Sequence, residues 1–183
     1  MNVKREDIVD GRMEALLMDA EQRGIFTRMT PEDREISKKK TLAQIPDGSD
    51  IWLFGYGSLM WNPTIEYDKR VPARVYGYHR QFCLWTHMGR GTPERPGLML
   101  ALQSGGSCDG FAYKVNKSHA DEELSIVWNR EMVSGAYVPR IVTLHTADGP
   151  VPGIAFVINR PILFGVAACC VGQFMFSPFR FSA

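Results

Sequence analysis

The stretch DIWLFGYGSLMWNP, residues Asp50 to Pro63, decides how the rest of the chain is interpreted. It opens with the apolar run Ile51 to Phe54, whose length and composition are typical of a β-strand. Gly55 and Gly57 then have no side chain, so a ligand can approach the main chain there. Backbone N–H groups gathered after a strand suit an anion or a developing oxyanion. The alternative is a buried strand that ends in a plain turn, and the spacing alone does not decide between them.

Two common glycine motifs do not fit this stretch. A dinucleotide-binding fingerprint needs a glycine where the chain has Met60. A phosphate-binding P-loop needs Gly-Lys-Ser/Thr, whereas Ser58 is followed here by Leu59. If the loop binds a ligand, it does so by another arrangement.

Five stretches resemble, in the same order, the ChaC family of γ-glutamylcyclotransferases that act on glutathione, of the bacterial type. They are FGYGSLMWNP (54–63), VYGYHRQFCLW (75–85), RGTPERPGL (90–98), GGSCDGFAY (105–113) and NREMVSGAYVPR (129–140). The resemblance covers roughly residues 50–159. It implies a small barrel-like sheet with helices packed beside it.

Composition narrows the class of protein. With 183 residues, of which 45% are hydrophobic, the chain can bury a core. A net charge of +1 indicates neither nucleic acid nor an anionic membrane as a partner. The cysteines form no CxxC motif, which argues against zinc. The charged start lacks the apolar core of a signal peptide, so we expect a cytoplasmic protein. Its oligomeric state is not indicated.

Residues 1–49 are expected to form a helical N-terminal extension. Apolar residues recur at helical spacing over Asp10 to Gln22. Thr30 and Pro31 predict the cap and first residue of a second helix. The charge run Lys38 to Lys40 is expected to be a solvated helix face.

Residues 50–160 are expected to form the cyclotransferase domain. The pattern there predicts several strands and one inserted helix, hence an α+β fold with a mostly antiparallel, barrel-like sheet. Gly77 is expected to form a bulge and Gly105–Gly106 a turn between two strands. The predicted strands are 71–85, 98–102, 111–115, 137–145 and 154–158.

The inserted helix carries the strongest chemical signal. Ser118 is the predicted cap. Leu124, Val127 and Trp128 form one apolar stripe, and the next position on that stripe is Glu131. A carboxylate is therefore expected to face the core.

Glu131 also lies at the end of this helix, just before Gly135, where the helix dipole disfavours negative charge. Burial and dipole would both raise its pKa, as a general base and acid requires. The alternative is a structural ion pair with Arg140 or Arg74. The resemblance favours catalysis, because the Glu of the family's R-E-M element is its catalytic residue.

The resemblance also implies a substrate-binding set. The backbone of the signature loop would hold the glutamyl carboxylate or the oxyanion, and Arg90 and Arg95 could pair with the glycyl carboxylate of glutathione. The alternative for the two arginines is a solvated basic loop. The complete set is Tyr56, Gly57, Ser58, Leu59, Arg90, Arg95 and Tyr137.

The last segment, 161–183, departs from the family pattern. It is apolar, with one charge in 23 residues, and shows no clear period. Its apolar part is short for a membrane span. One hypothesis is that this end comes from a misread or shifted reading frame.

The resemblance implies cleavage of glutathione to 5-oxoproline and cysteinylglycine, with Glu131 as general base and acid. This chemistry needs no metal and no organic cofactor. Two alternatives stay open: a cyclotransferase for other γ-glutamyl amines, and a non-catalytic regulator that binds a partner.

Overall fold

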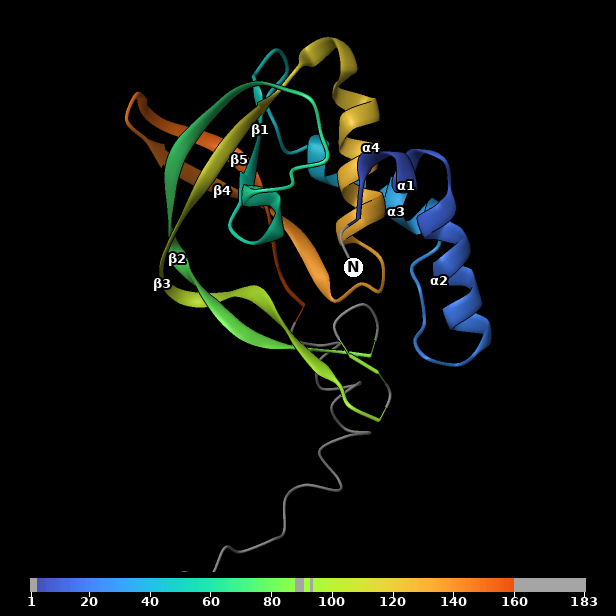
Figure 1. Cartoon of the computed structure of the whole chain (residues 1–183). Helices are drawn as coiled ribbons and strands as arrows, with labels where there is room; N and C mark the ends of the chain where they lie inside the picture. Colours follow the sequence, from blue (N-terminus) through green and yellow to red (C-terminus); the bar gives the residue numbers. More distant parts are fainter. Residues whose placement is uncertain (1–2, 88–90, 93, 160–183) are drawn as a thin grey trace, which may run out of the picture.

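Five strands close into a barrel in the order β1-β3-β2-β4-β5 (Figure 1). Neighbours are antiparallel except where β5 meets β1 and β3. The computed structural model describes residues 3–87, 91–92 and 94–159, so the predicted tail 161–183 and Arg90 lie outside the described residues. The α+β prediction is confirmed. The strands are β1 (Ile51–Gly55), β2 (Tyr67–Thr86), β3 (Gly97–Val115), β4 (Tyr137–Thr146) and β5 (Gly149–Ile158).

Strand β1 is buried on both faces. Consecutive side chains of a strand point to opposite sides. Leu53 therefore packs outward, in one cluster with Leu124 and Trp128. Phe54 packs inward, in the barrel cluster with Val75. Because both sides of β1 meet apolar groups, an uninterrupted apolar run is the sequence that this position requires.

Strands β2 and β3 form one long, bent hairpin. The predicted bulge at Gly77 is confirmed, with φ of 84° and a shift of register. The predicted turn at Gly105–Gly106 is wrong, because β3 runs through both residues. Their φ angles of 102° and 70° are left-handed, and they bulge opposite Gly77. Bulges on both strands bend the pair without reversing the chain.

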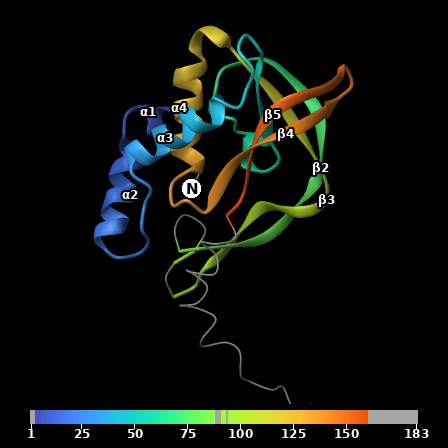
Figure 2. The same cartoon turned by 180° about the vertical axis from the view of Figure 1, so that it is seen from behind.

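The helices gather on one side of the barrel, with α4 next to the sheet (Figures 1 and 2). Trp128 of α4 packs edge-on against Phe156 of β5, with ring centroids 5.1 Å apart. No helix in the described ranges has both the length and the apolar composition needed to span a bilayer. The helices are α1 (Arg5–Val9), α2 (Arg12–Gln22), α3 (Pro31–Leu42) and α4 (Ala120–Glu131), with short 3-10 turns η1 (Ser58–Met60) and η2 (Lys117–His119).

The helix starts follow the sequence signals in one case and not in another. The Thr30 side chain accepts from the N–H of Asp33, and Pro31 is the first residue of α3, as predicted. The prediction that Ser118 caps α4 is wrong. Asn116 instead accepts from the N–H of Ser118 and starts the turn η2. An Asn side chain accepts from the N–H two residues ahead more strongly than Ser does, so Asn116 rather than Ser118 starts the turn.

Lys38 corrects the prediction of a solvated charge run. It is 1% exposed, and its ammonium contacts Glu35 at 2.9 Å and Asp121 at 2.8 Å. Burial lowers the pKa of Lys38, but the bonds to the two carboxylates outweigh burial and raise it. One lysine of the run Lys38 to Lys40 is therefore buried, and its contact with Asp121 joins α3 to α4.

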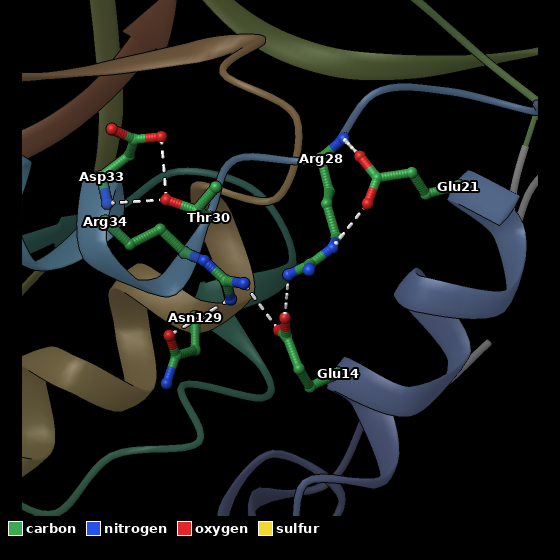
Figure 3. Close-up of polar contacts among 7 residues, drawn as sticks. All are labelled: Glu14, Glu21, Arg28, Thr30, Asp33, Arg34 and Asn129. Carbon is green, nitrogen blue, oxygen red and sulfur yellow. Dashed lines mark hydrogen bonds and ion pairs between the residues drawn. The ribbon is translucent and has the colours of Figure 1, made fainter.

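A second polar network joins α2 and α3 to the last turn of α4 (Figure 3). Glu14 accepts from both Arg28 and Arg34. Arg34, which is buried, also donates to Oδ1 of Asn129 at 3.2 Å. Asn129 lies two residues before Glu131, so this network helps to fix the end of α4.

An ion pair between Arg5 and Glu123 holds the start of α4. The pair is bidentate, at 2.6 and 2.7 Å, and the N–H of Glu66 donates to the same carboxylate at 2.8 Å. Burial raises the pKa of Glu123, but these bonds outweigh it and lower the pKa below its ordinary value.

Replacing Arg5 by Ala should lower the free energy of unfolding by about 3 kcal/mol, since Glu123 would stay buried without its cation. This is the low end of the range for buried pairs, because the Arg5 side chain is itself 28% exposed. Urea denaturation at pH 7 measures the change. Arg12→Ala, in an ion pair that is exposed on both sides, should leave stability nearly unchanged.

The same pair makes a pH test possible. A lowered folded-state pKa means that the stabilisation is present above the ordinary Glu value of 4.5 and is lost as the pH falls through the lowered one. Arg5→Ala should flatten this part of the stability curve. An unchanged curve would show that Glu123 does not depend on Arg5.

Candidate active site

The signature loop packs tightly where β1 ends. A Cβ at Gly55 would lie 2.9 Å from Cε2 of Tyr113 and 3.1 Å from Cβ of Leu59. The Tyr113 hydroxyl donates to the carbonyl of Leu59 at 2.7 Å. Gly55 therefore lets the loop fold back onto β3, and this contact sets the path of the residues that follow.

Gly57, two residues on, faces open space. The nearest atom to a Cβ placed there would be Cδ2 of Leu100, at 3.9 Å. The N–H groups of Gly57, Ser58 and Leu59 donate to no acceptor in the described part of the chain. No described protein atom fills the space beside Gly57, so this space and the N–H groups are available to a ligand.

Glu131 is the last residue of α4, and its side chain is 15% exposed. Burial raises its pKa, and the neighbouring Arg130 opposes that shift in part. The alternative, an ion pair with Arg74 or Arg140, is not found among the described contacts: Arg74 binds Asp109 at 2.6 Å, and Arg140 is exposed. A raised carboxyl pKa is what proton transfer near neutral pH requires.

Arg130 was not predicted as a site residue. Its Nε lies 3.3 Å from Oε1 of Glu131, and its Nη2 donates to Oγ of Ser58 at 2.9 Å. Its Nη1 donates to the carbonyl of Asn62 and to Oγ1 of Thr64. The signal in the sequence was its position before Glu131 in the R-E-M element, but nothing local shows that it reaches the loop.

Tyr56 lies near both Glu131 and Tyr137. Burial, then Tyr137 and then Glu131 raise the pKa of Tyr56 well above its ordinary value. The Tyr56 hydroxyl donates to the carbonyl of Phe156 at 2.9 Å, and that of Tyr137 donates to the carbonyl of Leu100 at 3.0 Å. Both phenols are thus hydrogen-bonded to the barrel backbone, and Tyr56 lies close enough to Glu131 to sense its charge.

Arg80 is a second cation that sequence reasoning missed. From β2 its Nη1 donates to the carbonyl of Tyr56 at 3.3 Å. The residue is exposed, and no carboxylate in the described ranges lies within ion-pair distance of it. It places a positive charge beside the signature loop, where a carboxylate of a ligand could bind.

The two predicted arginines of the β2–β3 loop are not brought to Glu131 by any described contact. Arg90 lies outside the described residues. Arg95 is exposed, and its backbone N–H and C=O bond to Thr92. Figures 1 and 2 show this end of the hairpin well away from α4. A substrate role for either arginine stays a prediction.

The site thus combines a buried carboxylate with backbone donors on the loop. Glu131 can accept and return a proton, and the N–H groups of residues 57–59 can stabilise an anion. The described residues hold no group of three or more His, Cys, Asp or Glu that could bind a metal ion.

The region that contains this site matches a known protein family. Residues 51–161 match the model of the ChaC-like proteins. The chain belongs to the ChaC family. The glutathione-specific γ-glutamylcyclotransferase of Escherichia coli K12 is 43% identical over 129 residues, which cover 70% of this chain and 56% of that protein.

Two further similarities extend the comparison. Glutathione-specific γ-glutamylcyclotransferase 1 of Danio rerio is 33% identical over 66% of this chain and 65% of that protein. The chain thus spans about 56% to 65% of the length of these two relatives. A crystal structure of a yeast γ-glutamyl cyclotransferase specific to glutathione superposes with a TM-score of 0.48 at 24% identity, covering 69% of this chain and 61% of that one.

The two loop glycines should respond differently to the same substitution. Gly55→Ala should lower the free energy of unfolding by about 1–3 kcal/mol, because its methyl group would overlap Tyr113 and Leu59. Gly57→Ala should lower it less than Gly55→Ala does, since its methyl group enters open space. Thermal and urea unfolding measure both. Equal losses would show that Gly57 also has a packing role.

Proposed function

We propose that this protein is a γ-glutamylcyclotransferase that converts glutathione into 5-oxoproline and cysteinylglycine. The observation that carries the proposal is the buried Glu131, whose raised pKa suits it to move protons beside the signature loop. Membership of the ChaC family supports the reaction type. The names of its relatives, glutathione-specific γ-glutamylcyclotransferases, support glutathione as substrate.

The reaction begins with proton removal. The substrate's own α-ammonium group loses a proton to Glu131, which frees the lone pair of the nitrogen. The amine nitrogen then attacks the γ-carbonyl carbon of the same glutamyl unit and closes a five-membered ring. Because both reactants belong to one molecule, holding the glutamyl arm in a folded shape removes much of the entropic barrier.

The second half of the reaction breaks the amide. Ring closure leaves negative charge on the former carbonyl oxygen, and the loop N–H groups at residues 57–59 are suited to hold it or the glutamyl carboxylate. When the intermediate collapses, the carbon–nitrogen bond to cysteine breaks. Glu131 returns its proton to the leaving nitrogen, and the second proton of the attacking nitrogen also passes to that leaving group, which departs as an ammonium. The ring nitrogen is left as a neutral lactam, no water is consumed and the carboxylate is regenerated.

Two other functions make different predictions for one assay. A cyclotransferase for other γ-glutamyl amines would release 5-oxoproline from those compounds faster than from glutathione. A non-catalytic regulator would release none from any of them. We propose that the reaction takes place in the cytoplasm, which agrees with Cys108 being a free thiol.

Glu131→Gln should lower turnover of glutathione by at least about 100-fold, because the amide keeps the shape of the side chain but cannot accept the ammonium proton. Release of 5-oxoproline measures turnover, and circular dichroism checks the fold. Glu122→Gln, an exposed carboxylate on the same helix, is the matched control and should keep wild-type turnover. Near-normal turnover by Glu131→Gln would remove Glu131 from the mechanism.

The recognition of the glycyl end is tested by comparing two substrates. If Arg95 binds the glycyl carboxylate, Arg95→Ala should raise KM for glutathione several-fold but leave KM for γ-glutamylcysteine unchanged, because that dipeptide lacks the glycine. Arg80→Ala should be measured beside it, since Arg80 is the exposed cation next to Tyr56. Equal effects of Arg95→Ala on both substrates would contradict this role for Arg95.

A further inference from the structure

Arg130 connects the end of α4 to three points of the segment that follows β1. One Nη donates to Ser58, and the other to the carbonyl of Asn62 and to Thr64. Its Nε faces Glu131 at 3.3 Å. Four of the five N–H donors of a guanidinium are thus directed at the loop or at the carboxylate. A planar fork fixes these positions relative to one another in a way that a single ammonium does not.

The geometry differs from that of a structural ion pair. In the Arg5–Glu123 pair both Nη atoms of the guanidinium donate to the carboxylate, at 2.6 and 2.7 Å. The two Nη atoms of Arg130 donate to neutral oxygens. Glu131 receives a single, longer contact, from Nε. Burial lowers the pKa of Arg130, and Glu131 alone opposes that shift. A buried cation is therefore kept beside a carboxylate that it does not fully bind.

The backbone beyond Ser58 is itself unusual where Arg130 binds it. Thr64 has a φ of 61°, in the left-handed region, which a β-branched residue rarely adopts. Arg5 donates to the carbonyl of Thr64, while Arg130 donates to its hydroxyl. Thr64 is thus held from α1 and from the last turn of α4, which opposes relaxation of the strained residue.

We propose that Arg130 is a positioning residue for the reaction. Its fork sets the distance between Glu131 and the Ser58 loop, and its charge keeps Glu131 available as a carboxylate. This inference rests on the proposed function for its consequence in catalysis, but its effect on Glu131 can be measured without turnover.

The sign of that effect follows from the groups around Glu131. Arg130 faces it from α4, Tyr56 from the loop after β1, and Tyr137 lies beside Tyr56 at the start of β4. Tyr56, whose pKa is raised well above its ordinary value, carries no charge near pH 7. In the described part of the chain, Arg130 is the cation that lowers the pKa of Glu131 against the effect of burial. Removing it should therefore raise that pKa.

The decisive experiment compares Arg130→Met with the wild type by ¹³C NMR titration of protein labelled at the Glu side-chain carboxyl carbon, with Glu131→Gln used to assign the signal. The pKa of Glu131 should rise by about one unit or more, the usual effect of losing an adjacent opposite charge. The acidic limb of the kcat profile should move upward by the same amount. A pKa of Glu131 that stays unchanged overturns the proposed electrostatic role.

Arg130→Lys separates charge from positioning and remains informative if the Met variant unfolds. It should keep the Glu131 pKa close to the wild-type value while kcat still falls at least about 10-fold, because an ammonium cannot hold three loop oxygens at once. Wild-type kcat in Arg130→Lys overturns the positioning role. Ser58→Ala combined with Arg130→Lys should be less than additive, since both changes remove the same contact.

Arg70→Met is the matched control. Arg70 donates to the carbonyl of Met60 at 3.0 Å, at the end of the same loop, but it stacks on Phe111 and does not contact Glu131. It should leave the Glu131 pKa and kcat unchanged, and a shift as large as that of Arg130→Met would overturn the proposal. If the wild type releases no 5-oxoproline, the proposed function fails, and the NMR titration still decides the effect of Arg130 on Glu131.

Discussion

The packing of α4 on the barrel is the contact on which the site depends. Leu124, Val127 and Trp128 are almost fully buried, and Trp128 meets Phe156 at 5.1 Å. One further turn along the same face brings Glu131 to the sheet. Burying apolar side chains contributes about 1.5–3 kcal/mol each, so this stripe can offset the cost of desolvating a carboxyl group. The raised pKa of Glu131 is therefore a consequence of how its helix is held, because the stripe and the carboxylate share one face.

Polar contacts from the N-terminal helices hold α4 from its other side. Arg5 grips Glu123 in the first turn, Lys38 meets Asp121, and Arg34 binds Asn129 near the last turn. Hydrophobic packing tolerates sliding, whereas hydrogen bonds to buried charged groups are directional and costly to leave unmade. Helices α1 to α3 thus fix the rotation and the register of a helix whose last residue does the proposed chemistry. The family match begins only at residue 51, so this support comes from outside the matched region.

The parts of the fold that the sequence predicted are those set by short-range patterns. The apolar run of β1, the helical stripe ending at Glu131 and the cap at Thr30 can each be recognised within a few residues. The bend at Gly105–Gly106 was misread because a glycine pair fits either a turn or a bulge, and the choice depends on pairing with Gly77 across the hairpin. Arg130 was missed for a similar reason, since its partners Ser58 and Thr64 lie more than 60 residues away. Long-range pairing of this kind leaves no local trace.

The two opposing influences on Glu131 suit the two roles that the proposed reaction gives it. As a base it must be ionised when the ammonium group arrives, and as an acid it must give its proton to a poor leaving nitrogen. Burial alone would favour the second role, because it stabilises the neutral acid and raises the pKa. A close, fully bidentate cation would favour the first, as Arg5 does for Glu123, whose pKa is lowered. A single contact at 3.3 Å from a guanidinium held mainly by loop oxygens lies between these extremes. The proposed reaction therefore needs Arg130 near Glu131 but hydrogen-bonded mainly to the loop. The loop whose N–H groups are proposed to face the substrate is then also the segment that keeps Arg130 from binding Glu131 more closely.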